Sequence, residues 1–375
     1  MKKLKLMTIL GTRPEIIRLA AVIKRADKYF DHLLVHTGQN YDYTLNKIFF
    51  EDLDLREPDF YLNCVGKDLG ETMGNIISSS YTLMKEQKPD ALLILGDTNS
   101  ALSAISAKRL KIPIFHMEAG NRCWDWNVPE MVNRTIVDRI SDINMPYTEH
   151  SRRYLISEGA DPKTLFVTGS PLAEVMEMYK EKIEKSDVLT RLGLKKGKYV
   201  VVSAHREENV DDEERFFTLM GAINDVAKKY KVPVIFSTHP RTRKKIEERG
   251  FVFDKLVKNI EPLGYTDYNK LQKDSLLVLS DSGTLSEESA IEDFAGVLIR
   301  TSTERPEAVE SGTVIQGGIT SESILQAAEM AIEAAKSKDK GTLSDAYMAK
   351  DVSVRVVKII QSLTDTVNET VWHKF

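Results

Sequence analysis

The chain has 375 residues, and its 52 basic and 56 acidic side chains give a formal net charge of −4. The length suits two domains better than one hydrophobic core, and the near balance of charge argues against a global field that attracts nucleic acid or an anionic membrane. The two cysteines, Cys64 and Cys123, form no C-x-x-C pair, which argues against a disulfide framework and structural zinc and suits a reducing compartment.

The N-terminus begins K-K-L-K-L-M-T-I-L-G. Its apolar run is far shorter than the hydrophobic part of a signal sequence or a membrane span. We therefore expect a soluble, cytoplasmic protein that binds neither membrane nor nucleic acid.

Short apolar runs alternate with longer amphipathic stretches along the whole chain. Near-continuous apolar strands separated by helical patterns predict parallel sheets covered by helices on both faces. The predicted strands of the first half lie at 4–10, 32–37, 91–96, 112–117 and 165–169, and those of the second half at 198–205, 232–239, 275–282 and 296–301.

A charged, lysine-rich helical pattern between the two series ends near Lys198 and marks the expected domain junction. We predict an α/β protein with two doubly wound, Rossmann-like domains that face one cleft. The N-terminal domain is expected at 1–170 and the C-terminal domain at 171–355. A last helix at 356–375 is expected to pack back on the N-terminal domain.

The residues that follow the predicted strands are the candidate site, because open parallel sheets bind ligands at the carboxyl ends of their strands. Four of the seven histidines lie in these segments. In the first half the segments are 11–15, 36–39, 96–98 and 116–118, and in the second half 203–206, 238–241, 281–284 and 300–301.

The segment D-S-G-T-L-S-E-E at 281–288 combines a strand end, a turn of small residues and the start of a helix. Backbone N–H groups and the positive end of a helix dipole bind anions well, so the segment is a candidate phosphate site. A plain N-cap is an equally good interpretation, since Ser and Thr cap many helices. Either Glu287 or Glu288 could accept hydrogen bonds from ribose hydroxyls, or both could simply be solvated.

The segment G-T-R-P-E at 11–15 is a tight turn with proline in the first turn of a helix. Arg13 is expected to point at the same cleft. Neither the G-x-G-x-x-G fingerprint nor the Walker motif G-x-x-x-x-G-K-[ST] follows any predicted strand. Dinucleotide and ATP chemistry are therefore disfavoured.

Asp97, Glu118 and Glu130 lie at adjacent strand ends or in the loop that follows one. They are candidate catalytic carboxylates, and the alternative is helix capping and salt bridging with Arg122 and Arg134. Spacing alone does not separate the two interpretations.

Two histidines need separate interpretations. H-M-E at 116–118 matches the H-x-E of zinc deaminases, but no P-C-x-x-C follows. We therefore expect no metal and a His116 that is hydrogen-bonded at its strand end. S-A-H-R-E-E-N at 203–209 places His205 and Arg206 opposite the carboxylates if the domains face each other. His205 could then hydrogen-bond to a leaving phosphate or give it a proton, and a core histidine is the alternative.

Taken together, these motifs resemble the non-hydrolysing UDP-N-acetylglucosamine 2-epimerase family, whose fold is the two-domain glycosyltransferase-B type. The matching segments run in order from residue 11 to 313. They are G-T-R-P-E, T-G-Q, G-D-T, H-M-E-A-G-N-R, P-E followed by N-R, T-G-S-P, H-R-E-E-N, T-H-P-R, D-S-G-T-L-S-E-E and T-E-R-P-E-A-V-E-S-G-T.

The resemblance implies an enzyme that inverts C2 of a UDP-activated N-acetylamino sugar by elimination and re-addition of UDP, without a cofactor. Asp97, Glu118 and Glu130 match the family's catalytic carboxylates, and His205 matches its histidine near the diphosphate. The implied substrate contacts are Arg13, Arg18, Gln39, Tyr268 (stacked on uracil), Ser282 and Gly283 (phosphates) and Glu288 (ribose). Arg18 stands where many members have lysine, and a homodimer is also implied.

The segment between Glu118 and Glu130 is shorter than in the UDP-N-acetylglucosamine enzymes, and Met131 replaces the second Glu of P-E-E. This form of the loop resembles the capsule and O-antigen branch, which converts UDP-2-acetamido-2,6-dideoxy-L-talose to UDP-N-acetyl-L-fucosamine. Trp124 and Trp126 would suit the methyl group of a 6-deoxy sugar. The alternatives are conversion of UDP-N-acetylglucosamine to UDP-N-acetylmannosamine, a UDP-sugar-dependent glycosyltransferase and a non-catalytic binding module.

Overall fold

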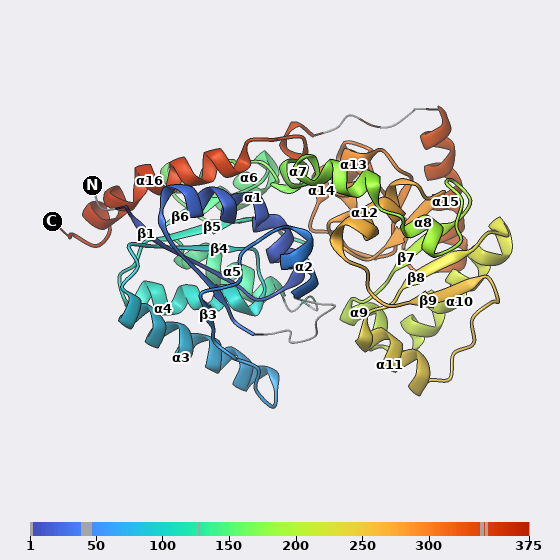
Figure 1. Cartoon of the computed structure of the whole chain (residues 1–375), viewed down its shortest axis with the longest axis horizontal. Coiled ribbons are helices and arrows are strands. Elements are labelled where there is room, and N and C mark those ends of the chain that lie inside the picture. The colour runs from blue at the N-terminus through green and yellow to red at the C-terminus, as the bar shows by residue number, and fades with distance from the viewer. Residues whose placement is uncertain are drawn as a thin grey trace. The chain divides into compact units, whose positions relative to one another are not determined.

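The computed structural model describes residues 3–38, 47–126, 128, 130–337, 341 and 344–374. The chain forms two compact units (Figure 1): unit 1 comprises Met1–Met178 and Asp345–Phe375, and unit 2 comprises Tyr179–Ser344. The sequence placed the corresponding boundaries at 170 and 355, whereas the chain enters unit 2 after Met178 and leaves it after Ser344.

Unit 1 is built on a six-stranded sheet with the strand order β3-β2-β1-β4-β5-β6. All neighbours are parallel, and the strand order reverses between β1 and β4. This is the doubly wound arrangement that the sequence predicts. The strands are β1 (Lys5–Leu10), β2 (Asp31–His36), β3 (Phe60–Tyr61), β4 (Ala91–Leu95), β5 (Ile114–Met117) and β6 (Ile143–Met145).

Helices cover both faces of this sheet (Figure 1). On one face, Leu83, Ala104 and Val137 from three helices pack with Met7 and Ile94 of the sheet in one hydrophobic core. On the other face, the first helix of the unit contacts its last helix. The helices are α1 (Arg13–Tyr29), α2 (Lys47–Asp52), α3 (Leu69–Gln87), α4 (Ser103–Arg109), α5 (Glu130–Ile140), α6 (Glu149–Ser157) and α16 (Val352–Thr370), and α7 (Leu172–Lys185) runs from unit 1 into unit 2.

Unit 2 repeats this topology with the strand order β12-β11-β10-β7-β8-β9, which reverses between β10 and β7. The core contains Phe216 and Val226 of one helix and Ile324 of another, packed with Phe236 and Leu279 of the sheet. The strands are β7 (Val200–Ser203), β8 (Val234–Ser237), β9 (Val257–Ile260), β10 (Leu277–Ser280), β11 (Gly296–Leu298) and β12 (Ile315–Gln316). The helices are α8 (Val188–Arg191), α9 (Glu207–Val210), α10 (Glu213–Tyr230), α11 (Pro240–Glu248), α12 (Tyr265–Lys273), α13 (Leu285–Glu292), α14 (Pro306–Glu310) and α15 (Ser321–Ser337).

One predicted strand is wrong. Residues 165–169 contain only an isolated bridge between Leu165 and Asn144, and Gly169, with φ of 83°, turns the chain away from an extended path. The edge strand of the sheet is instead β6, which the sequence analysis missed. It is three residues long and has the polar Asn144 at its centre, so it lacks the apolar run by which a buried strand is recognised.

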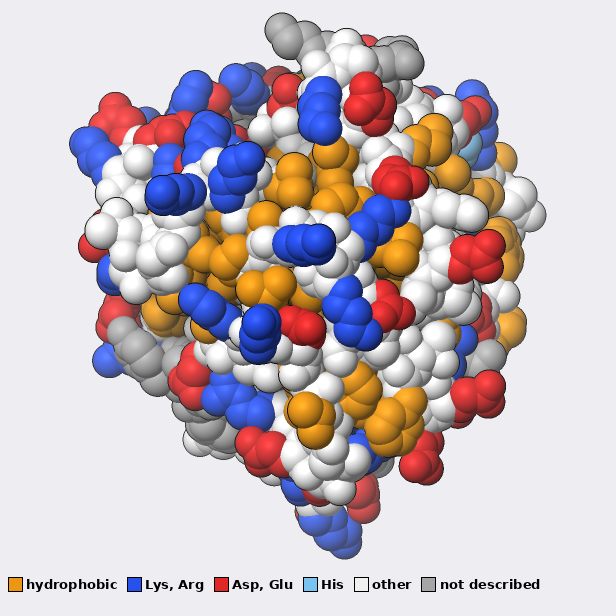
Figure 2. Space-filling model, turned by 90° about the vertical axis from the view of Figure 1, so that its right-hand side faces the viewer, with side chains coloured by type: hydrophobic (Ala, Val, Ile, Leu, Met, Phe, Trp, Pro, Cys, Tyr) orange, Lys and Arg blue, Asp and Glu red, His pale blue; other side chains and the backbone are white. Residues whose placement is uncertain are grey.

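None of the helices in the described ranges is long and apolar enough to cross a bilayer. Figure 2 shows one face of the molecule, on which basic and acidic side chains both surround a group of hydrophobic side chains. Charges of both signs are thus mixed on this face, in keeping with the composition.

Candidate functional site

The carboxyl edge of the unit 1 sheet brings several predicted residues together at the point where the strand order reverses. The loops after β1, β4 and β5 carry Arg13, Asp97 and Glu118. A Cβ atom added to Gly96 would lie only 3.8 Å from Oε2 of Glu118, so this carboxylate approaches the backbone next to Asp97. The two carboxylates that the sequence predicts to be neighbours therefore lie on neighbouring loops.

Glu118 is buried, with 6% of its surface exposed. It forms an ion pair with Arg18 of α1, and its Oε1 accepts a hydrogen bond of 3.3 Å from Nδ2 of Asn121. Its backbone has φ of 63°, a left-handed conformation that costs a non-glycine residue about 1–2 kcal/mol. Backbone strain of this kind persists where the surrounding structure fixes a side chain in a functional position.

Asp97 forms an ion pair with Arg134 of α5. The neighbouring Asn133 donates from Nδ2 to the backbone carbonyl of Asp97 at 3.0 Å and to Oδ1 of Asn99 at 3.0 Å. The predicted salt bridge to Arg134 thus exists, and it fixes the carboxylate at the strand end.

Glu130 is the first residue of α5. Its Oε2 is buried and has no hydrogen-bond partner within the described ranges. A buried carboxylate oxygen without a donor carries a desolvation cost that a bound ligand can remove.

Arg13 begins α1, and its guanidinium carbon lies 5.7 Å from the ring centre of Phe49. This cation–π contact places the charge beside α2. The other predicted residue near this edge, Gln39, lies outside the described residues.

Glu15 is a buried carboxylate that the sequence analysis left without a role. Its Oε2 accepts hydrogen bonds from the backbone N–H of Gly11 at 3.0 Å and the hydroxyl of Thr12 at 2.8 Å, and its Oε1 accepts one from Ser100. Burial raises the pKa of Glu15, and the hydrogen bonds from Ser100, Thr12 and Gly11 only partly offset this effect. Glu15 therefore joins the loops after β1 and β4. Its position in the motif G-T-R-P-E is the feature of the sequence that could have identified it as part of the site.

The carboxyl edge of the unit 2 sheet places His205 against the buried Asp281. The backbone N–H of His205 donates to Oδ2 of Asp281 at 2.9 Å, and Nδ1 of its ring lies 3.3 Å from Oδ1. The ring stacks on His239 at a centroid distance of 6.1 Å. Because 30% of its side chain is exposed, His205 is not a core histidine.

Asp281 accepts a further hydrogen bond, of 2.9 Å, from the backbone N–H of Arg206. Burial alone acts to raise the pKa of Asp281, but the charge and hydrogen bond of His205 and the backbone N–H of Arg206 outweigh it and lower the pKa. The aspartate of D-S-G-T therefore orients His205, a role that the sequence analysis did not assign.

The turn before α13 contains Ser282 and Gly283. The Ser282 hydroxyl lies 2.9 Å from that of Thr284, and a Cβ atom added to Gly283 would lie 3.7 Å from Oε2 of Glu304 and 3.9 Å from Nη2 of Arg206. A guanidinium and a carboxylate, 3.8 Å apart, thus both lie beside the helix N-terminus, where backbone N–H groups favour an anion.

The two glutamates of α13 differ in their surroundings. Glu287 is fully buried, and its Oε1 lies 2.8 Å from Nη2 of Arg305. Glu288 is only partly buried, and its Oε2 accepts a hydrogen bond of 2.9 Å from Nε2 of Gln272 on α12. Glu288 is therefore the better candidate to contact a ligand. Tyr268 lies on the same helix as Gln272 and is also partly buried.

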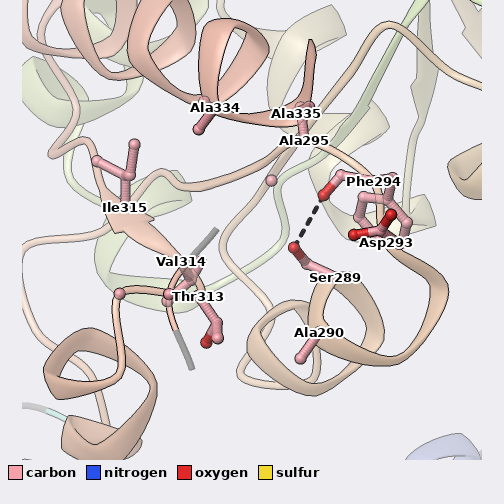
Figure 3. Close-up of a pocket in the computed structure, with 14 residues that line it drawn as sticks. Ser289, Ala290, Asp293, Phe294, Ala295, Thr313, Val314, Ile315, Ala334 and Ala335 are labelled. Atoms are coloured by element: carbon pink, nitrogen blue, oxygen red, sulfur yellow. Dashed lines mark hydrogen bonds between the residues drawn. The ribbon is translucent and has the colours of Figure 1, made fainter. Parts of the chain in front are cut away.

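A pocket of 260 Å³ lies elsewhere in unit 2, beside the C-terminal half of α13 and the start of β11 (Figure 3). Ala290, Ala295 and Val314 line it, and the Ser289 hydroxyl at its wall donates to the carbonyl of Phe294 at 3.0 Å. None of the predicted site residues lines this pocket.

In the described parts of the chain, no group of three or more His, Cys, Asp or Glu side chains is arranged to hold a metal ion. His116 lies 2.8 Å from the carbonyl of Gly96 through Nε2 and 3.0 Å from Asp138 through Nδ1. The prediction of a hydrogen-bonded strand-end histidine is confirmed. Arg122 pairs with Asp138 and Glu158 and not with the candidate carboxylates.

Two doubly wound α/β units, with carboxylates at the strand ends of the first and a turn of small residues before a helix in the second, have the two-domain fold of the glycosyltransferase-B type. The chain belongs to the UDP-N-acetylglucosamine 2-epimerase family, whose model matches residues 23–361. It is therefore a UDP-sugar 2-epimerase, an isomerase, and the glycosyltransferase and binding-module alternatives fall away.

Epimerases that act on different UDP-sugars are similar to this chain along nearly its whole length. A structure of UDP-N-acetylglucosamine 2-epimerase from Rickettsia bellii is 42% identical, covers 99% of this chain and 100% of its own, and has a TM-score of 0.91. The Methanocaldococcus jannaschii enzyme in complex with UDP-GlcNAc and UDP is 34% identical, with 96% and 100% covered and a TM-score of 0.89. The UDP-2,3-diacetamido-2,3-dideoxy-D-glucuronate 2-epimerase of Pseudomonas aeruginosa is 30% identical, with 96% and 100% covered.

Proposed function

We propose that the protein converts UDP-2-acetamido-2,6-dideoxy-L-talose to UDP-N-acetyl-L-fucosamine, for capsule or O-antigen synthesis. The observation that carries this proposal is the loop after Glu118, on which Trp124 and Trp126 are 60% and 66% exposed. Indole rings exposed on a loop that starts at a candidate catalytic carboxylate suit a ligand with an apolar edge. A 6-deoxy sugar has a methyl group where glucosamine has a hydroxymethyl group.

The base of this loop is firmly held. Arg122 donates to Asp138 at 2.7 Å and to Glu158 at 2.6 Å. Trp124 has a left-handed backbone, with φ of 58°, and its ring meets Tyr154 edge to face at a centroid distance of 5.6 Å. The Trp124 indole is thus presented from a fixed backbone, and covering about half of one such ring gains on the order of 2 kcal/mol.

The proposed reaction breaks and remakes the same bonds. The hydrogen at C2 has no neighbouring carbonyl to acidify it, so its removal is coupled to departure of UDP from C1, which leaves a 2-acetamidoglycal. UDP oxygen then adds back to C1 while a proton returns to the other face of C2. Proton transfer in both directions requires carboxylates around C2, and we assign this task to Asp97, Glu118 and Glu130.

The leaving UDP needs positive charge and hydrogen-bond donors at its diphosphate. We assign this role to His205 and to the helix N-terminus at Ser282 and Gly283. Glu288 binds the ribose hydroxyls, and Tyr268 stacks on uracil. Arg13, Arg18 and Gln39 complete the substrate contacts.

Conversion of UDP-N-acetylglucosamine to UDP-N-acetylmannosamine is the second candidate. The similarity to the UDP-N-acetylglucosamine 2-epimerases of Rickettsia bellii and Methanocaldococcus jannaschii favours it. We further propose that the protein acts as a homodimer.

The two reactions are distinguished by incubating the protein in D2O with each UDP-sugar and following deuterium at C2 by NMR. We expect turnover of the 6-deoxy-L-talose substrate with deuterium uptake at C2, and a higher kcat/KM than with UDP-N-acetylglucosamine. Preference for UDP-N-acetylglucosamine would refute the sugar assignment, and epimerisation without deuterium uptake would refute the proton-exchange mechanism.

The role of the indoles is tested in the same assay with Trp126→Ala. Loss of about 2 kcal/mol of ligand contact raises KM about thirtyfold. The matched control is Tyr81→Ala, which removes an aromatic side chain that is 40% exposed on α3 of the same unit. An equal effect of both substitutions would contradict a specific contact between Trp126 and the sugar.

A further inference from the structure

The three proposed catalytic carboxylates of unit 1 lie on three separate elements, and one buried pair contacts all three of these elements. We propose that His116 and Asp138 are positioning residues that hold Asp97, Glu118 and Glu130 in register. The inference rests on the catalytic roles proposed for these carboxylates and is independent of the identity of the sugar.

His116 connects the pair to the loop of Asp97. Its side chain is fully buried in β5, and its Nε2 lies 2.8 Å from the backbone carbonyl of Gly96, the residue before Asp97. A carbonyl oxygen only accepts, so Nε2 donates this hydrogen bond. His116 thereby fixes the end of β4 from the neighbouring strand.

Asp138 connects the pair to the loop of Glu118. Its carboxylate lies 3.0 Å from Nδ1 of His116 and accepts the backbone N–H of Gly120 at 3.2 Å and 3.1 Å through its two oxygens. It also accepts from Nη1 of Arg122 at 2.7 Å. The loop that begins at Glu118 is therefore held at Gly120 and again at Arg122.

The loop that begins at Glu118 has little room to move at Gly120. Gly120 has φ of 80°, and a Cβ atom added there would lie 2.4 Å from the carbonyl of Ser151. Its backbone is thus pressed against α6 while its N–H is held by Asp138. A shift of this N–H is transmitted to Glu118, two residues earlier.

Asp138 also fixes the helix of Glu130. It lies on α5, which begins at Glu130, and its backbone carbonyl accepts a hydrogen bond of 2.9 Å from Nδ2 of Asn144. Burial acts to raise the pKa of Asp138, but the hydrogen bond and charge of His116 and the charge of Arg122 outweigh it and lower the pKa. The carboxylate of Asp138 is therefore held by three groups, His116, the backbone N–H of Gly120 and Arg122. Asn144 holds its backbone carbonyl separately.

The chain offers a matched control in Asp142. The side chains of Asp138 and Asp142 are 3% and 2% exposed. Asp142 likewise pairs with a cation, Lys108 at 2.6 Å, and accepts a backbone N–H, from Ile114 at 2.9 Å. Ile114 is the first residue of β5, so this bond lies at the edge of the sheet opposite to the carboxylates. Asp142 can therefore support stability without reaching the candidate site.

The experiment compares Asp138→Asn and Asp142→Asn in the full chain. The measurements are Tm, kcat and KM with the UDP-sugar that the unmodified protein epimerises, and Kd for UDP. We expect both variants to lose Tm, and only Asp138→Asn to lose kcat, by about tenfold to a hundredfold, because displacement of reacting groups by about 1 Å is costly. KM and the Kd for UDP should stay within about threefold, and His116→Gln should show the same selective loss of kcat.

Two results would show that His116 and Asp138 have only a structural role. One is a loss of kcat in Asp142→Asn that parallels the loss in Asp138→Asn, and the other is a normal kcat in folded Asp138→Asn. If Asp138→Asn does not fold, a normal kcat in His116→Gln overturns the proposal by itself. A near-normal kcat in Glu118→Gln would instead overturn the carboxylate roles on which the proposal rests, so the two failures are distinguishable.

Discussion

The buried ion pair between Arg18 and Glu118 allows a prediction that separates stability from activity. The two side chains are 9% and 7% exposed. Arg18→Met removes the cation and leaves a buried carboxylate with its hydrogen bond from Asn121 at 3.3 Å. Breaking a buried pair in this way costs about 3–5 kcal/mol. For a unit of roughly 200 residues each kcal/mol lowers Tm by about 2–4 °C, so we expect a loss of about 6–20 °C.

The second substitution gives the prediction its control. Adding Glu118→Gln replaces the carboxylate that has lost Arg18 by a neutral amide of the same shape, and most of the lost stability should return. Activity should not return, because one of the three carboxylates proposed for proton transfer is absent, and kcat should stay at least about a hundredfold below that of the unmodified protein. Thermal unfolding by circular dichroism and a turnover assay measure the two quantities. A double variant no more stable than Arg18→Met, or one that recovers activity, would refute the reasoning.

Two other outcomes are expected. His205→Ala should lower kcat by at least about a hundredfold. It should also lower the free energy of unfolding, because the buried Asp281 loses the ring that pairs with it; a near-normal kcat would show that the role of His205 is misassigned. Burial lowers the pKa of His36 to about 4 from 6.5, so its contribution to stability is fully present above pH 6.5 and is lost as the pH falls through the folded pKa. Urea unfolding should show a loss of about 3 kcal/mol between pH 6.5 and 4 that is missing in His36→Gln, and identical pH profiles would contradict this cause.

The fold was largely predictable because its signals are local. Near-continuous apolar strands alternate with amphipathic helices, and this pattern leads directly to two doubly wound sheets. The error at 165–169 has the same origin, because a short edge strand with Asn144 at its centre gives a weaker apolar signal than the segment that follows it. Whether a segment forms a strand depends on pairing with a neighbouring strand. A short stretch of sequence does not show this pairing.

The parts of the site that escaped prediction all depend on contacts between distant residues. Asp138 reads in the sequence as one polar position of an amphipathic helix, and only the fold brings it to His116. The choice between Glu287 and Glu288 depends on Arg305, which pairs with Glu287 inside the unit. The ends of the strands predict which segments contribute residues to the site. Ion pairs between elements determine which side chain of such a segment remains accessible to a ligand.

A comparison of the two units shows how the same local device can serve two purposes. In each unit a buried aspartate holds a histidine near the carboxyl edge of a sheet, Asp138 with His116 and Asp281 with His205. His116 is fully buried and its two ring nitrogens face Gly96 and Asp138, so it can act only through the backbone that it holds. His205 keeps 30% of its side chain exposed, so the same kind of partner leaves it able to meet a ligand. The sequence shows both as strand-end histidines, and exposure, which depends on the helices packed around each sheet, determines whether such a residue positions other groups or contacts the substrate itself.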